Sequence, residues 1–337
     1  MSKRITVTID KVLGENNISP PYELATVEPT QYGAELIVNT YLQRCINIDI
    51  DDQHNWRRRR GSANIYVGDI HSIWSVNDYC LFREGNALKR LQITSKSPLT
   101  ISVSTLRSDL TTAKIPMNYL SLDKAVYYSD GLLSGVIENG VSRNWGATVT
   151  TAISRLEPPP SGTFLFYFNT RVYVGQYNRV WYSEINGYEY FDLENNYLQL
   201  ESPISVILPL KDGIWIITQN KTWFFDGGDA PFTKDEKANY GAIEGSGIIL
   251  DEILLGDKVQ SFPTAGGKSS QRVAMWTSTN GHVCMGGNGG LFRCLTEKTF
   301  ATPNAPFGTG LLKQDRGISQ YLVSLRNPSS EVPNIYN

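Results

Sequence analysis

The 337-residue chain is poor in the residues on which metal and redox sites depend. It has three histidines and four cysteines, Cys45, Cys80, Cys284 and Cys294, and no two cysteines form a CxxC pair. Zinc sites and disulfide frameworks usually show cysteines paired at short spacings. We therefore expect neither a metal site nor disulfides. Cys80 and Cys284 fall at equivalent points of the repeat described below, and we expect both to be small buried side chains.

Long apolar segments and a strong net charge are also missing. No apolar run approaches the length of about 18 residues that a membrane helix needs, and the N-terminus MSKRITVTIDKVLG lacks the apolar segment of a secretory signal. The net charge is −2 and the pI is near 6.0. These absences predict a chain that is made in the cytosol, is not inserted in a membrane, and does not hold nucleic acid over its whole surface.

A pattern of short apolar segments separated by turns repeats along the chain. It is clearest over residues 204–232, where three such segments are divided by turns rich in Gly, Asn and Asp. The first turns of successive units fall at residues 78, 123, 169, 212 and 280, which gives intervals of 45, 46, 43 and 68 residues. A period of roughly 40–45 residues with bulky aromatics in each unit is typical of β-propeller blades.

We therefore predict an all-β, β-propeller-like fold with about five to six blades, each an antiparallel meander. The long interval would contain an insertion at about residues 234–270, and residues 309–325 are a candidate sixth unit. The expected organisation is an extended N-terminal arm (1–33), the propeller (34–326) and a C-terminal tail (327–337). A large β-sandwich, or a pair of them, is the alternative, because it too strings short strands between turns.

The sequence contains residue types of a catalytic triad, but their spacing argues against catalysis. Asp69, His71 and Ser72 lie on a predicted strand, where adjacent side chains point to opposite faces. We therefore expect no bond between His71 and Ser72 of the kind that activates a nucleophile. The acidic residues within 49–52 lack the Gly and Glu of a calcium loop. We predict no enzymatic activity, no cofactor and no bound metal.

Four consecutive arginines, Arg57, Arg58, Arg59 and Arg60, form the densest positive charge in the chain. On a strand-like segment their guanidinium groups would project to both faces, which suits phosphate contact or bidentate pairing with a neighbour's carboxylates. They are candidates for an interface or a DNA channel. The alternative is a solvated strand edge whose charge prevents pairing with another edge.

Tyrosines are concentrated near the middle of the chain. Tyr177, Tyr188 and Tyr190 lie in or beside predicted turns and are candidates for contact with a receptor or a partner. The alternative is that these rings pack in the core and between blades.

Several short motifs, taken in order, resemble the β-propeller tail proteins of tailed bacteriophages. They are residues 47–51 (NIDID), 57–61 (RRRRG), 71–74 (HSIW), 180–184 (VWYSE) and 212–215 (DGIW). The chain resembles in particular the hub, or packaged-DNA stabilisation, and nozzle proteins of short-tailed phages, over roughly residues 34–300.

The resemblance implies a structural protein of the virion tail, synthesised in the host cytoplasm. Copies would form a homo-oligomeric ring around the channel below the portal, retain packaged dsDNA without sequence specificity, and pass it at infection. Its implied partners are other tail proteins, namely a portal-proximal adaptor and the fibres or tip. A receptor- or glycan-binding propeller at the tail tip is the alternative function, and a polysaccharide-degrading enzyme ranks after it.

Overall fold

The computed structural model describes most of the chain between residues 8 and 326. The described residues are 8–15, 17–19, 24–29, 36–42, 48–50, 56–58, 64–76, 79–112, 115–146, 155–251, 272–315 and 318–326. The regular elements among them are strands, apart from one short 3-10 helix at Asn288–Gly290. The chain divides into two compact units, residues 64–236 and residues 1–63 with 237–337.

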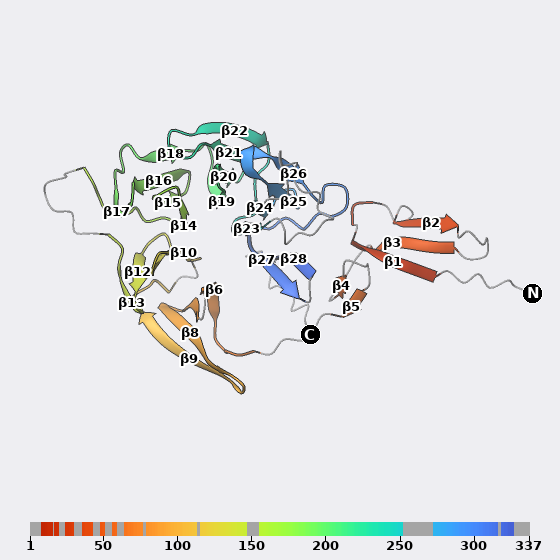
Figure 1. Cartoon of the computed structure of the whole chain (residues 1–337), viewed down its shortest axis with the longest axis horizontal. Helices are drawn as coiled ribbons and strands as arrows, with labels where there is room; N and C mark the ends of the chain where they lie inside the picture. Colours follow the sequence, from red (N-terminus) through yellow and green to blue (C-terminus); the bar gives the residue numbers. More distant parts are fainter. Residues whose placement is uncertain are drawn as a thin grey trace, which may run out of the picture. The chain divides into compact units, whose positions relative to one another are not determined.

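In the unit of residues 64–236, the described residues form four antiparallel sheets whose strands follow one another along the chain (Figure 1). The first sheet contains β6 (Ile70–Val76), β7 (Tyr79–Glu84), β8 (Ala87–Lys96) and β9 (Leu99–Arg107). The second contains β10 (Asn118–Leu122), β11 (Ala125–Ser129), β12 (Ser134–Glu138) and β13 (Val141–Asn144). The third contains β14 (Phe164–Phe168), β15 (Arg171–Gln176), β16 (Arg179–Glu184), β17 (Gly187–Phe191) and β18 (Tyr197–Gln199). The fourth contains β19 (Ile204–Pro209), β20 (Gly213–Thr218), β21 (Thr222–Asp226) and β22 (Thr233–Ala238).

The other unit contains a further sheet of four strands, which we call the fifth sheet, together with smaller pieces among its described residues. The sheet consists of β23 (Ile248–Asp251), β24 (Arg272–Thr277), β25 (Val283–Gly286) and β26 (Phe292–Cys294). A hairpin of β27 (Phe307–Asp315) and β28 (Ile318–Arg326) occupies the candidate sixth unit. A second hairpin pairs β4 (Ile48–Ile50) with β5 (Trp56–Arg58). The successive antiparallel meanders confirm the predicted all-β, propeller-like class.

The predicted first turns agree with the structure in four units. Asp123, Asn169 and Asp212 lie in the first hairpin turn of their sheets, and β6 and β7 flank residue 78. Asn169 and Thr170 have φ of 40° and 67°, as expected of a two-residue hairpin turn between right-twisted strands. Asparagine tolerates this left-handed conformation better than most residues do.

The fifth turn was assigned to the wrong hairpin. Asn280 lies between β24 and β25, which are the second and third strands of their sheet. The first connection of that sheet is residues 252–271, outside the described residues, so the extra chain length follows β23. The expected insertion therefore begins too early, because residues 234–238 complete the fourth sheet as part of β22.

Cys80 and Cys284 are not equivalent, because Cys80 lies on β7, the second strand of its sheet, and Cys284 lies on β25, the third strand of its sheet. Cys284 is paired with Trp276, whereas Cys80 is paired with Ser75, one residue after Trp74. A shift of one residue moves a side chain to the other face of a sheet. Cys284 is accordingly buried and Cys80 is half-buried, which corrects the expectation that both would be buried.

Residues 1–33 contain regular structure that the sequence pattern did not reveal. β1 (Thr8–Glu15) and β2 (Ala25–Pro29) pair with β3 (Leu36–Leu42), β1 in parallel and β2 antiparallel. The β1 pairing has two register irregularities, so the strand lacks the clean alternation that identifies a strand in sequence. The predicted extended arm is thus partly a sheet.

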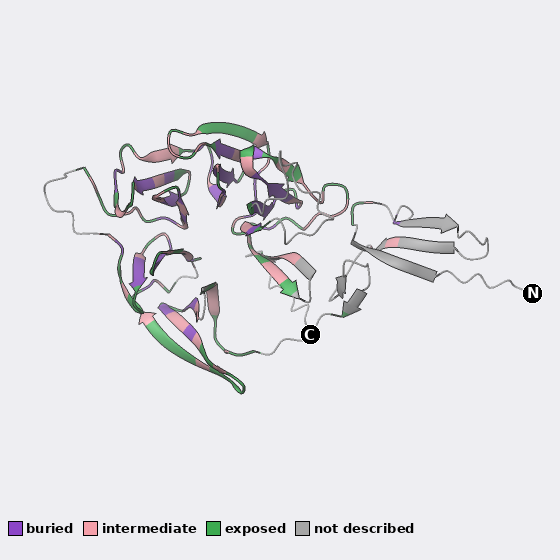
Figure 2. Cartoon of the chain, in the orientation of Figure 1, coloured by how far each residue is buried: buried purple, intermediate pink, exposed green. Residues whose placement is uncertain are grey.

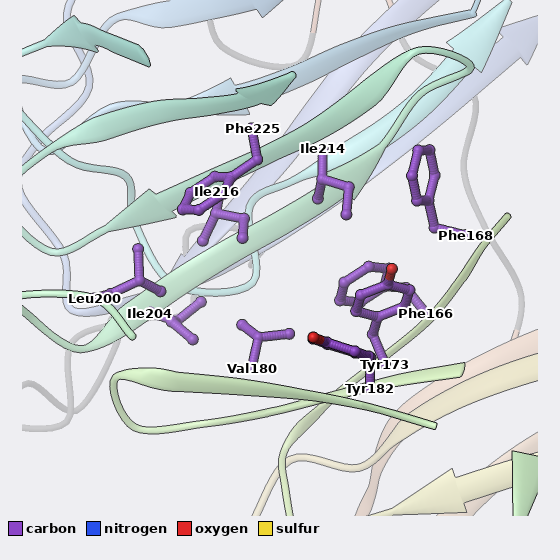
Figure 3. Packing of buried hydrophobic residues seen from close by; sticks show 10 residues of the cluster. All are labelled: Phe166, Phe168, Tyr173, Val180, Tyr182, Leu200, Ile204, Ile214, Ile216 and Phe225. Atoms are coloured by element: carbon purple, nitrogen blue, oxygen red, sulfur yellow. The ribbon is translucent and has the colours of Figure 1, made fainter. Parts of the chain in front are cut away.

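Apolar clusters fill the space between successive sheets of the 64–236 unit. One lies between the first and second sheets, one between the second and third, and one between the third and fourth. In the last, Phe166, Tyr173 and Val180 face Ile214 and Ile216 (Figure 3). Each inner sheet therefore buries both faces, and burial on this scale dominates the stability of such a fold.

A buried ion pair joins the first two sheets. Arg83 and Asp130 are fully buried, with Arg83 Nη1 3.0 Å from Asp130 Oδ2. The Arg83 side chain also donates to carbonyl oxygens, including that of Ile115 at 3.2 Å. Asp130 Oδ1 accepts hydrogen bonds from the backbone N–H groups of Leu132 (2.9 Å) and Leu133 (2.7 Å). The pair is tolerated in the interior because both charges are fully hydrogen-bonded.

We predict that Asp130→Ala lowers the free energy of unfolding by about 3–5 kcal/mol, because it leaves the Arg83 guanidinium buried without its counter-ion. The measurement is urea unfolding followed by tryptophan fluorescence. The matched control is Glu236→Ala, which removes the half-exposed partner of Lys221 and should cost about 0–1 kcal/mol. Equal losses in the two variants would contradict the assignment of Arg83–Asp130 as a structural connection.

Candidate functional site

The β8–β9 hairpin extends beyond the other strands of its sheet. β7 pairs with β8 only from Ala87 to Gln92, whereas β8 and β9 pair as far as Lys96 and Leu99. Residues 93–101 therefore form a ribbon of only two strands, and most of β9 is exposed (Figure 2). Such a ribbon is marginally stable in water, so a neighbouring surface would stabilise it.

The apolar side chains of this hairpin gather on one face. Ile93 stands opposite Ile101, and Leu91 stands opposite Val103. Directly opposed residues share a face, and Leu99 joins them by alternation along β9. Leu91 is buried, but Val103, Ile93 and Leu99 are 38%, 45% and 52% exposed. An apolar stripe thus continues from the core of the sheet toward the exposed tip.

β9 is also an edge strand, and its protection is limited to one register irregularity near its end, between Thr105 and Arg107. It is the last strand of its sheet, and no strand among the described residues pairs with its outer side. From Leu99 to Leu106 the sequence LTISVSTL contains no charge and no proline. Natural edge strands usually carry lysine, proline or a bulge, which discourages pairing with another chain. The outer side of β9 can therefore accept a further strand.

Polar contacts hold the base of the hairpin. Arg107 donates to Tyr128 Oη (3.2 Å) and to Asn144 Oδ1 (3.0 Å), both on the second sheet. Arg107 Nε lies 2.5 Å from Asp109 Oδ1. This hydrogen bond raises the pKa of Arg107 and lowers the pKa of Asp109, so both remain charged near neutral pH. The exposed ribbon thus extends from a fixed base.

The arginine run lies only partly within the described residues. Arg57 and Arg58 belong to β5, where Arg57 is paired with Asp49 of β4 and Arg58 is exposed. Arg59 and Arg60 lie outside the described residues. The assignment of the run to an interface or a DNA channel therefore stays a prediction.

The three candidate tyrosines do not form one surface. Tyr177 lies in the turn before β16 with φ of 52° and is 69% exposed. Tyr188 and Tyr190 lie on β17, which pairs with the last two residues of β16 and so sits at its other end. The ring of Tyr188 packs edge-on against Tyr167, with 6.0 Å between centroids. Tyr177 is thus the prominent exposed ring, and Tyr188 contributes to packing.

A hydrogen bond joins His71 and Ser72, although the alternation of side chains along a regular strand predicted none. The pairing of β6 with β7 is irregular between His71 and Trp74, and Ser72 has φ of 54°. This bulge interrupts the alternation of side chains, and His71 Nδ1 lies 2.9 Å from Ser72 Oγ. The expectation that the two side chains would diverge was wrong because it assumed a regular strand.

The Ser72 hydroxyl has a structural partner as well. Its oxygen accepts a hydrogen bond from the backbone N–H of Met117 at 2.8 Å. Met117 is buried just before β10, so this bond connects the first sheet to the second. The unfavourable φ of Ser72 is maintained because it positions the hydroxyl for this bond. We interpret the Ser72 hydroxyl as a structural connection between the two sheets.

Among the described residues, no three side chains of His, Cys, Asp and Glu are grouped so that they could hold a metal ion. The same residues include no helix of the length and apolarity that crossing a membrane requires.

No protein-family model matches the sequence, and no curated protein matches it. Among solved structures, the chain is similar to a Saccharomyces cerevisiae assembly of a Dbp5 variant with Nup159, a Gle1 variant, IP6 and ADP. The identity is 10%, the match covers 96% of this chain and 88% of that chain, and the TM-score is 0.43. The N-terminal domain of Nup159 is 10% identical to this chain. The match covers 95% of this chain and 87% of that domain, and the TM-score is 0.43. Saccharomyces cerevisiae Sqt1 is 10% identical. The match covers 83% of this chain and 78% of that chain, and the TM-score is 0.36. At these values the similarities carry no argument about function.

We predict that Ser72→Ala destabilises the protein by about 1–3 kcal/mol, because it leaves the buried N–H of Met117 without an acceptor. Urea unfolding measures the change. Ser72→Gly loses the same bond but removes the strain of a positive φ, so its loss should be smaller by roughly 1 kcal/mol. A stability of Ser72→Ala equal to that of the wild type would rule out the structural connection.

Proposed function

We propose that this protein is a non-enzymatic structural component of a bacteriophage tail, a hub or nozzle that surrounds the DNA channel. It works through contacts between copies of the chain and with other tail proteins. The observation that supports assembly is the uncharged edge strand β9, with its exposed apolar face. The short motifs that resemble tail proteins of short-tailed phages support the placement in a tail.

A second copy of the chain is the partner that suits the β8–β9 hairpin best. An edge without charge calls for a neighbour whose contacting surface is also without charge, and β9 itself presents such a surface over Leu99–Leu106. Pairing of β9 with β9 of a second copy is a two-fold contact that covers this edge in both copies, and a ring of more than two subunits uses a second, different contact as well. The exposed side chains of Leu99, Ile93 and Val103 then add apolar burial to backbone pairing.

The arginine run has a separate role in this proposal. Exposed Arg58, with its three neighbours, provides positive charge for phosphate contact that reads no sequence. This suits dsDNA that must be held in a channel and later released. It equally suits pairing with carboxylates of an adjacent subunit. Replacement of Arg57–Arg60 with serines tests both roles.

Exposed Tyr177 is the observation that favours the alternative, a receptor- or glycan-binding propeller at the tail tip. Flat aromatic rings at a surface are suited to stacking on sugars and to protein contacts. Binding of the isolated protein to host cells that is competed by surface polysaccharide, and lost in Tyr177→Ala, would favour this function over the hub.

We predict that Leu99→Lys combined with Val103→Lys prevents self-assembly. Two added charges on the edge strand would be buried without partners in the proposed contact. Analytical ultracentrifugation should show an oligomer for the wild type and a monomer for the double variant, with unchanged circular dichroism. Leu132→Lys is the matched control, because Leu132 is an exposed apolar residue in a turn. A double variant that assembles like the wild type would contradict the hairpin contact.

The placement in a tail is tested by labelling the protein with a small tag and gold in intact particles. We expect gold at the tail, near the head vertex or along the short tube, and its absence from all particles would overturn the proposal. In the same particles, replacing Arg57–Arg60 with serines should reduce assembly or DNA retention, because it removes four positive charges. Unchanged assembly and retention would remove the arginine run from the proposed interface.

A further inference from the structure

Two cysteines of the fifth sheet face each other on adjacent strands. Cys284 of β25 is paired with Cys294 of β26. The backbone bond from Leu295 N to Val283 O (2.8 Å) flanks them, which identifies a non-hydrogen-bonded pair. In such a pair the Cα atoms are about 4.5 Å apart and the side chains are at their closest. A disulfide spans this separation without movement of the backbone.

The two thiols are free and differ in their access to solvent. Cys284 is fully buried, whereas Cys294 is half-buried near the end of β26. A small reagent therefore reaches Cys294 first. Cys284 lies behind it on the adjacent strand, where its sulfur can attack Cys294 Sγ once Cys294 is joined to the reagent.

The surroundings of Cys294 favour its thiolate. The hydrogen bond from Cys284 does most to lower the pKa of Cys294 to about 7, and the charge of His282 and a backbone bond at Thr296 also lower it. Partial burial and the carboxylate of Glu297 oppose this shift. The same hydrogen bond, followed by burial, raises the pKa of Cys284. Near neutral pH the pair therefore consists of an attacking thiolate and a protonated thiol.

We propose that Cys284 and Cys294 are a redox-active dithiol site that reacts with a low-molecular-weight disulfide and closes into a cross-strand disulfide. Cys294 is the attacking sulfur and Cys284 the resolving one. The register of the strands and the unequal exposure of the two thiols carry this inference. It does not depend on the proposed function.

The reaction proceeds in two balanced exchanges, here with oxidised glutathione. The thiolate of Cys294 attacks one sulfur of the reagent, the reagent S–S bond breaks, and one glutathione thiolate leaves. Cys284 then loses its proton to solvent and attacks Cys294 Sγ, which releases the second glutathione thiolate. The protein loses two electrons and two protons, and one glutathione disulfide becomes two glutathione thiols.

The test uses the full-length folded protein treated with oxidised glutathione, quenched with an alkylating agent and digested with trypsin. Cleavage at Arg272, Arg293 and Lys298 places the two cysteines on different peptides, residues 273–293 and 294–298. We expect these peptides to be joined by a disulfide. Absence of the linked pair in folded protein that has reacted with the reagent would overturn the proposal.

Variants separate the roles of the two sulfurs. Cys284→Ser should retain glutathione on Cys294, because nothing resolves the mixed disulfide, whereas Cys294→Ser should leave Cys284 unmodified. Cys80→Ser is the control and should form the cross-link as the wild type does. If Cys284→Ser fails to fold, Cys284→Ala serves the same purpose, and the peptide mapping of the wild type decides the question alone.

The rate of the first exchange gives an independent readout. With a pKa near 7, Cys294 should react at neutral pH at least about threefold faster than an ordinary cysteine, since a larger thiolate fraction outweighs its lower nucleophilicity. The rate should rise as pH passes through 7 and level off above 8. Equal labelling of Cys80 and Cys294, whose pKa values are shifted in opposite directions, would contradict the proposed site.

Discussion

The packing of each sheet against its neighbours in sequence is the constraint on which the 64–236 unit depends. An inner sheet has two faces to bury, and its central strands show this directly. All five residues of β11, in the second sheet, are buried. Burial on both faces removes the alternation of polar and apolar residues that marks a half-exposed strand. Consecutive meanders therefore supply both the core and the order in which the sheets pack.

Polar groups inside this packing work as connections between sheets. Arg83 and Asp130 neutralise each other where the first and second sheets meet, and the hydroxyl of Ser72 accepts the N–H of Met117 at the same boundary. The Ser72 connection depends on a bulge in β6, and the Arg83–Asp130 connection depends on two buried charges. Buried polar groups of this kind stabilise a fold only when all their hydrogen bonds are made. Residue types that suggest catalysis can therefore serve the architecture.

Two features suggest roles other than stability, namely the exposed β8–β9 hairpin and the pair of cysteines in the fifth sheet. The β8–β9 hairpin continues past β7, and no strand in the described part of the chain covers its outer edge. In the fifth sheet, the close approach of β25 and β26 brings Cys284 and Cys294 together, with one thiol buried and the other half-exposed. One feature suits contact between copies of the chain and the other suits thiol exchange. They lie in different units and can be tested separately.

The sequence by itself determined the all-β class, the meander repeat and four of its first turns, because turn residues and apolar segments are local signals. It misplaced the turn at Asn280, because an intact hairpin looks the same whether it is the first or the second of its sheet. Only the tertiary structure decided the one-residue difference between Cys80 and Cys284, the bulge at Ser72, and the pairing of Cys284 with Cys294. Register and bulges arise from pairing between strands, and a single residue of slippage reverses which face a side chain occupies. The exposed edge of β9 was likewise decided by tertiary structure, since no local pattern states which strand of a sheet is left without a neighbour.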